Sequence, residues 1–392
     1  MNLDEHTVGA RGSQAVLADR IFDGRRWHVH AAALIKGDRI EALVPWDEVP
    51  DDCPQRRLPS GILLTPGFID LQVNGGGGLL LNDHPTAEGM RAIARTHLRY
   101  GTTACLPTLI TDTRDRMLAA VAAARTTAGR DGVLGLHLEG PFISPARPGI
   151  HLVDRIATPT LGDLDWLADL AGAGHSLLTV APERVPNGFL KRLASTGIRV
   201  SVGHSEATAE VVMRAVDDGL TGVTHLFNAM PPFAGRQPGI VGTTFAEPRL
   251  IAGIIVDGIH VDPLAVRAAF AAKGAEGIAL VTDAMPSVGA TLDRFQLMGR
   301  TISLKDGRLT AHDGTLAGAH LDMASAVRNA VNLAKLPLED ALRAASLTPA
   351  TFLGLEQERG ALVGGAHADM VALTPSLDVV ATWRDGVEQN HV

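Results

Sequence analysis

The sequence is poor in aromatic residues and in cysteine. Its 392 residues include ten Phe, four Trp and one Tyr, and only two cysteines, Cys53 and Cys105. Two cysteines cannot build a disulfide framework, and this pair lacks the close spacing of a thiolate zinc site. We therefore expect a protein of the reducing cytoplasm.

The sequence also lacks an excess of positive charge and lacks long apolar runs. Against 43 Asp and Glu stand 35 Lys and Arg, a net charge of −8, which argues against a general nucleic-acid-binding surface. No run reaches the roughly 18 apolar residues of a membrane-spanning helix, and the first residues contain no apolar segment of a secretion signal. We expect no nucleic-acid partner and no membrane segment.

Histidine, in contrast, is abundant, with 15 residues. The chain is 46% hydrophobic, which is enough for a sizeable core, and its length suits one large domain with a satellite or two medium domains. Many histidines beside few aromatic residues indicate metal or acid–base chemistry.

The chain ends and the middle follow different patterns. Short β-rich runs cover residues 15–22, 27–35, 39–44, 368–373 and 377–383. The middle alternates apolar strands with Ala-rich amphipathic stretches such as 88–99, 114–128, 208–218 and 263–272. Eight strands are predicted there, over residues 66–72, 102–108, 133–139, 177–181, 198–202, 222–226, 250–256 and 278–282. This succession favours an α/β fold of the (β/α)₈ TIM-barrel type, and an open doubly wound sheet is the alternative.

Polar side chains follow six of these predicted strands. They are Gln72, Asn74, His137, Glu139, His204, His225, His260 and Asp283. A single histidine at a strand end is usually structural, but active sites of such barrels lie where the strands end. Two imidazoles and one carboxylate form a ligand set of catalytic zinc, and Glu139, His204 and His225 provide it. With Asp283 as acid and base, the pattern predicts metal-assisted hydrolysis.

Several runs also resemble a known family. Residues 66–70, PGFID, resemble the first-strand signature of the amidohydrolase superfamily. The branch that deacetylates amino-sugar phosphates is matched by HLEGPF (137–142), GHS (203–205), THLFNAM (224–230), GRQPG (235–239), DGIH (257–260) and TDA (282–284). The resemblance implies a metallohydrolase barrel over residues 65–356 and a small β-sandwich domain formed by residues 1–64 and 357–392.

The resemblance also implies an activity. The acetamide of N-acetyl-D-glucosamine 6-phosphate would be hydrolysed to glucosamine 6-phosphate and acetate, in amino-sugar catabolism and cell-wall recycling. Metal-bound water would attack, and Asp283 would act first as general base and then as general acid. One divalent metal ion per subunit is expected, held by Glu139, His204 and His225. Zinc is the first choice and iron or cobalt the alternatives.

Gln72 and Asn74 stand where many members of the superfamily carry a His-x-His pair that binds a second metal ion. Amide groups are poor ligands for transition metals, so a one-metal site is predicted, with Gln72 contacting the metal-bound water or the substrate.

The family positions that contact substrate are matched here by Gln72, His151, Asn228, Ala229, Arg236, His260, Leu316, Ala317 and Gly318. Arg236 suits the phosphate, because a guanidinium forks onto phosphate oxygens, and His260 would join it. His151 would polarise the acetamide carbonyl. In this family one phosphate contact comes from the neighbouring subunit, which implies a homodimer.

Other activities of the same scaffold stay open. They include deacetylation of N-acetylgalactosamine 6-phosphate, hydrolysis of cyclic amides or dipeptides, and deamination, which would release ammonia. A barrel that only binds its ligand is disfavoured by the intact set of Glu139, His204, His225 and Asp283. The family pattern is weakest at Leu152-Val153 and Met285, in two loops expected to border the sugar.

Overall fold

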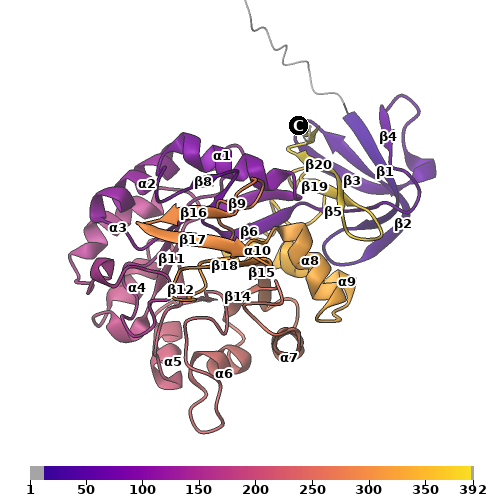
Figure 1. Ribbon diagram of the computed structural model, residues 1–392. Coiled ribbons are helices and arrows are strands. Elements are labelled where there is room, and N and C mark those ends of the chain that lie inside the picture. Colours follow the sequence, from indigo (N-terminus) through magenta and orange to yellow (C-terminus); the bar gives the residue numbers. More distant parts are fainter. Residues whose placement is uncertain (1–12, 390–392) are drawn as a thin grey trace, which may run out of the picture.

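The computed structural model describes residues 13–389 (Figure 1) and contains two large sheets, a parallel barrel and a separate sheet built from both chain ends. The barrel strands are β6 (Phe68–Val73), β9 (Thr102–Ile110), β10 (His137–Glu139), β11 (Leu177–Val180), β12 (Arg199–Val202), β13 (Gly222–Val223), β14 (Ile251–Ile255) and β15 (Ile278–Val281). Each strand pairs in parallel with its predecessor and its successor in this series. The eight predicted strands are thus confirmed, although β10 and β13 are shorter than expected.

The barrel closes between its first and last strands. Val73 and Ala284 form a parallel bridge, and the Asp283 amide donates to the Gln72 carbonyl at 2.9 Å. The strand order never reverses, whereas a doubly wound sheet requires such a reversal. The (β/α)₈ prediction is therefore confirmed and its open-sheet alternative is excluded.

Helices surround the barrel (Figure 1). They are α1 (Ala87–Leu98), α2 (Arg114–Thr127), α3 (Asp163–Ala171), α4 (Phe189–Ala194), α5 (Ala209–Asp217), α6 (Gly239–Ala246), α7 (Pro263–Lys273), α8 (Met323–Asn332), α9 (Leu338–Ala345) and α10 (Leu347–Leu353). Side-chain caps stabilise the first turn of several helices: the hydroxyl groups of Thr86, Thr113 and Thr208 each accept a hydrogen bond from a backbone N–H of that turn. Short 3₁₀ turns are η1 (Trp46–Glu48), η2 (Val153–Arg155) and η3 (Pro182–Arg184). Within residues 13–389, no helix has both the length and the apolar character needed to cross a bilayer.

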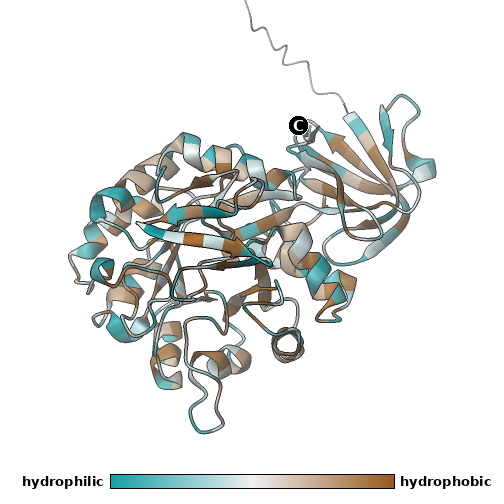
Figure 2. Ribbon diagram, viewed as in Figure 1, coloured by the Kyte–Doolittle hydropathy of each residue, from teal (hydrophilic) through white to brown (hydrophobic). Residues whose placement is uncertain are grey.

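Burial explains why the barrel strands read as continuous apolar runs. All residues of β6 and of β9 are buried, because side chains of one face fill the barrel and those of the other pack under helices. Figure 2 shows the same layering, with hydrophobic strands inside and hydrophilic segments concentrated on the outer helices and loops.

The chain ends share the second sheet. Its strands are β1 (Ser13–Phe22), β2 (Trp27–Lys36), β3 (Arg39–Pro45), β4 (Gln55–Arg57), β5 (Leu63–Pro66), β19 (Met370–Leu373), β20 (Val379–Arg384) and β21 (Val387–Glu388). Val16, Ile35, Leu64, Met370 and Trp383 meet in one core of this sheet. The predicted domain boundaries after residues 64 and 356 stay a prediction; β5 runs to Pro66, and β6 begins at Phe68.

Two small sheets were not anticipated. β7 (Gly75–Gly76) pairs with β8 (Leu79–Leu80), and β16 (Arg294–Leu297), β17 (Arg300–Lys305) and β18 (Arg308–Thr310) form an antiparallel sheet inserted between β15 and α8. Leu297, Ile302 and Leu309 of the insertion pack with Ile150 and Met285. The inserted sheet therefore supports two loops that border the candidate site.

Candidate active site

A pocket of about 390 Å³ lies at the carboxyl ends of the barrel strands. Most of the predicted site residues line it, namely Glu139, His151, His204, His225, Asn228, Ala229, His260, Asp283, Leu316 and Gly318. Ala317 is fully buried beside them in the hydrophobic cluster of the inserted sheet. Gln72 reaches the same group of residues from below, through hydrogen bonds to Glu139 and Asp283.

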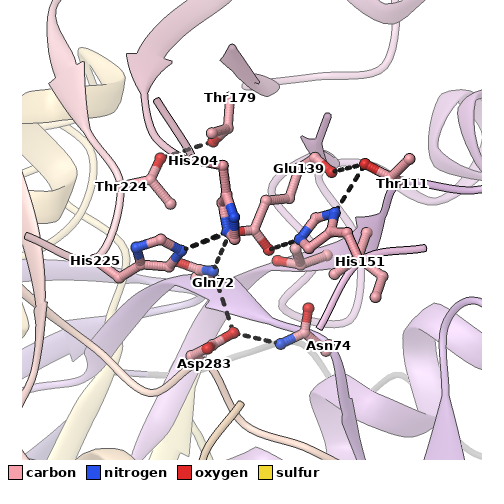
Figure 3. A network of polar contacts seen from close by, with 12 residues as sticks. Gln72, Asn74, Thr111, Glu139, His151, Thr179, His204, Thr224, His225 and Asp283 are labelled. Atoms are coloured by element: carbon pink, nitrogen blue, oxygen red, sulfur yellow. Dashed lines mark hydrogen bonds and ion pairs between the residues drawn. The ribbon is translucent and has the colours of Figure 1, made fainter. Parts of the chain in front are cut away.

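Glu139, His204 and His225 converge on one point (Figure 3). Oε1 of Glu139 lies 2.8 Å from Nε2 of His225 and 3.2 Å from Nε2 of His204, and the two nitrogens are 3.1 Å apart. Ligand atoms around a tetrahedral zinc ion with ~2.0 Å bonds are separated by about 3.3 Å. These three atoms therefore have the spacing of ligands on one metal ion.

The hydrogen bonding of His204 supports the same assignment. Its Nδ1 lies 2.8 Å from the backbone carbonyl of Arg147, which can only accept a hydrogen bond. Nδ1 must then carry the proton, and Nε2 presents a lone pair to the centre. Metal-binding histidines in general are oriented by such a partner on their other nitrogen, so this donor set fits a divalent ion.

His151 lies closer to the centre than its expected role as a substrate contact implied. Its Nε2 is 3.8 Å from Oε2 of Glu139, and Glu139, His151 and His204 form a group that could hold a metal ion. The Thr111 hydroxyl contacts its Nδ1 at 2.8 Å. Burial lowers the pKa of His151 to about 3. His151 is thus a neutral imidazole on the wall of the centre.

Three of these residues have a left-handed backbone conformation, which orients their side chains. φ is 47° at His204, 31° at His225 and 51° at Asp283. Such values are uncommon outside glycine and gather at functional sites, where the surrounding structure compensates a cost of about 1–3 kcal/mol. Each residue follows directly after an extended segment, so the turn carries its side chain over the mouth of the barrel.

Asp283 lies beside the centre and is held by two amides. Oδ1 accepts from Nδ2 of Asn74 at 2.6 Å and from Nε2 of Gln72 at 3.2 Å. Burial, and after it the charge of Glu139, raises the pKa of Asp283 to about 6. Burial alone would raise the pKa of Glu139, but its contacts with the imidazoles of His204 and His225 outweigh burial and hold that pKa well below its usual range. Of these two neighbouring carboxyl groups, Asp283 is therefore the one that takes up a proton more readily.

Arg236, the predicted phosphate contact, does not lie where that prediction placed it. Arg236 is exposed in the loop before α6 and does not line the pocket. His260 does line it, and its Nδ1 contacts Oδ2 of Asp257 at 2.6 Å.

The guanidinium-bearing residue that lines the pocket is Arg147, which sequence reasoning missed. Its side chain pairs with Glu206 at 2.6 Å. Arg147 lies four residues before His151 in a loop that contains Pro and Gly, and the sequence of this loop gave no sign of the direction of the side chain.

Comparison with known proteins agrees with this geometry. The model of the amidohydrolase family matches residues 63–389. An N-acetylgalactosamine-6-phosphate deacetylase of Shewanella sp. (strain ANA-3) is 42% identical over 86% of this chain and 85% of its own. An N-acetylglucosamine-6-phosphate deacetylase of Haemophilus influenzae is 36% identical over 91% of this chain and 93% of its own.

Solved structures show the same relationship. The crystal structure of N-acetylglucosamine-6-phosphate deacetylase from Pasteurella multocida superposes with a TM-score of 0.92 at 34% identity, covering 96% of this chain and 99% of that one. The chain therefore belongs to the amidohydrolase family, in the branch that contains these deacetylases.

Proposed function

We propose that the protein hydrolyses the acetamide of N-acetyl-D-glucosamine 6-phosphate in the cytoplasm, releasing acetate and glucosamine 6-phosphate. The observation that carries this proposal is the convergence of Glu139, His204 and His225 beside Asp283 in one pocket. Relatives named for this activity, such as the Haemophilus influenzae enzyme, support the choice of substrate.

One divalent ion, zinc before iron or cobalt, is the proposed cofactor, with Glu139, His204 and His225 as its ligands. Such an ion lowers the pKa of a bound water towards neutrality and polarises a carbonyl oxygen. Gln72 and Asn74 occupy the place of a second pair of imidazoles and donate hydrogen bonds to Asp283. This arrangement supports one ion per chain.

Asp283 is the proposed proton carrier. Its carboxylate takes a proton from the attacking water and then gives that proton to the departing amine, which leaves as glucosamine 6-phosphate. Its raised pKa, about 6, suits a group that must both accept and return a proton near neutral pH. Nε2 of His151 faces the same centre and is the proposed contact for the acetamide oxygen.

The sugar and phosphate would occupy the outer part of the pocket. Asn228, Ala229, His260 and the turn of Leu316, Ala317 and Gly318 are the proposed contacts. Arg236 is the proposed phosphate ligand in trans: because it is exposed and outside the pocket of its own chain, it would reach the pocket of a second subunit in a homodimer.

Product analysis tests the activity. Purified protein of measured metal content is given N-acetylglucosamine 6-phosphate, its galacto epimer and the unphosphorylated sugar, and acetate and ammonia are quantified. We expect acetate, fastest from the gluco phosphate. A preference for the galacto epimer would favour the activity named for the Shewanella relative. Release of ammonia would favour a deaminase. Equal rates for the phosphorylated and the unphosphorylated sugar would contradict the proposed contacts to the phosphate.

Subunit mixing tests the contact in trans. Asp283→Asn and Arg236→Ala subunits are each expected to be weak alone. In a mixed dimer, the site that keeps Asp283 receives Arg236 from its partner, and activity should return on mixing. If mixing restores nothing although mixed dimers form, Arg236 does not act across the subunits.

A further inference from the structure

Two amide side chains at the end of β6 share one oxygen of Asp283. Nδ2 of Asn74 lies 2.6 Å and Nε2 of Gln72 lies 3.2 Å from Oδ1, as Figure 3 shows. Gln72 also donates to Oε1 of Glu139 at 3.1 Å. Among residues 13–389, no hydrogen bond reaches the other oxygen, Oδ2. The two oxygens of Asp283 are therefore unequal.

We infer that Asn74 is a positioning residue for Asp283: with Gln72 it occupies Oδ1 and directs Oδ2 to the reacting atoms. This inference rests on the proposed function, in which Asp283 carries the proton. It gives the Gln-x-Asn pair a task of its own, beyond the lack of a second metal ion.

The backbone fixes the distance between the two groups. The backbone N–H of Asn74 donates to the backbone carbonyl of Ala284 at 2.9 Å, and the backbone N–H of Asp283 donates to the backbone carbonyl of Gln72 at 2.9 Å. Asn74 is 1% exposed and Gln72 is 2% exposed. The contact therefore belongs to the closure of the barrel and is shielded from water, which strengthens a hydrogen bond to a charged group.

The chemistry of the amide suits the task. A carboxylate only accepts hydrogen bonds, so the NH₂ group of Asn74 must face Asp283. The Asn74 carbonyl oxygen is then turned away from Asp283; it is buried and has no hydrogen-bond partner among the described residues. Neither amide titrates near neutral pH, so the pair orients Asp283 without competing for its proton.

Three variants separate positioning from a structural role. Asn74→Leu keeps the approximate size and removes both hydrogen-bonding groups, whereas Asn74→Ser keeps a donor. The matched control is Asn82→Leu, because Asn82 is equally buried and its Nδ2 donates to Oδ2 of Asp112 at 2.9 Å. For each variant we would measure kcat, KM, metal content, the melting temperature and a crystal structure.

If Asp283 loses its position in Asn74→Leu, the general base is misplaced, and we expect kcat to fall about 100-fold. KM and metal content should change little. Asn74→Ser should retain more of kcat than Asn74→Leu. Asn82→Leu should lose as much thermal stability as Asn74→Leu but keep kcat within about twofold.

The inference is overturned if Asn74→Leu keeps kcat within about threefold, or if Asn82→Leu lowers kcat as much as Asn74→Leu does. If Asn74→Leu does not fold, Asn74→Ala, which also removes both hydrogen-bonding groups, takes its place: an unmoved Asp283 carboxylate with unchanged kcat in that variant overturns the inference. If the parent protein releases no acetate, the proposed function fails. The orientation of Asp283 in the Asn74→Leu crystal, or in the Asn74→Ala crystal if Asn74→Leu does not fold, then decides the positioning role separately, with an unmoved carboxylate counting against it.

Discussion

The proposed metal-ligand end and the proposed phosphate end of the pocket are built in different ways. Glu139, His204 and His225 come from strand ends, are 2–5% exposed and contact one another within 3.2 Å. Arg236, in contrast, is exposed on a loop outside the pocket of its own chain. The proposed metal ligands thus all come from one chain, whereas the proposed phosphate contact of Arg236 would come from a second copy. Strand ends hold catalytic groups whose positions must be accurate to about an ångström, and loops carry groups that set substrate preference.

Removing the shared carboxylate should break the metal-ligand end most severely. In Glu139→Gln the charge that both imidazoles contact is lost, so we expect loss of the metal ion and of acetate release, measured by metal analysis and product assay. Glu247→Gln, a carboxyl group of the Arg249 ion pair outside the pocket, is the control. Full metal content with parental turnover in Glu139→Gln would refute the ligand assignment.

Asp283→Asn should separate catalysis from metal binding. The amide cannot take the proton, so kcat should fall about 10²–10⁴-fold, while metal content stays at the parental level because Asp283 is not a proposed ligand. Steady-state kinetics and metal analysis on one sample check both expectations. Near-normal turnover would remove Asp283 from the mechanism.

At the phosphate end, Arg236→Ala should act on substrate recognition alone. Loss of a charged hydrogen bond of about 1.5–3 kcal/mol corresponds to a fall of about 10–150-fold in kcat/KM for the phosphorylated sugar. The unphosphorylated sugar should be hydrolysed at the parental rate, which serves as the internal control. An equal loss for both sugars would mean that Arg236 supports the fold of the loop and not the phosphate.

The smallest effect is expected at the ion pair of Glu206 with Arg147, whose backbone carbonyl contacts His204. Glu206 pairs with Arg147 at 2.6 Å, both side chains are partly exposed, and such pairs contribute about 0.2–1 kcal/mol. Glu206→Gln should change KM and metal affinity by less than about fivefold, and the difference should shrink at high salt. A larger effect that persists in high salt would assign this pair to the metal-ligand end.

The sequence was most informative where chemistry and strand periodicity coincide. Glu139, His204, His225 and Asp283 could be predicted because they are polar residues at the ends of apolar strands, where the active sites of such barrels lie. The contact between Asn74 and Asp283 could not be predicted in the same way, because it spans 209 residues and depends on barrel closure. The left-handed backbone of His204 and His225 has no sequence signal either, since neither residue is the glycine that normally marks such a turn.

Loops explain most of what the sequence did not predict. The inserted sheet β16–β18 consists of short strands with mixed burial, whose pattern does not stand out between β15 and α8. The loop of Arg147 and His151 is set by its contacts, such as the Ser144 amide on the His204 carbonyl at 2.8 Å. Such long-range pairings determine loop geometry, and local propensity does not encode them.

The central claim is that one ion, held by Glu139, His204 and His225 beside Asp283, makes this chain a deacetylase. The most direct measurement removes the metal with a chelator and titrates zinc back while recording acetate release from N-acetylglucosamine 6-phosphate and bound metal per chain. The claim predicts that activity rises in proportion to zinc and reaches its maximum at one ion per chain. Acetate release that is equally fast without metal, or that begins only after a second ion binds, would contradict it.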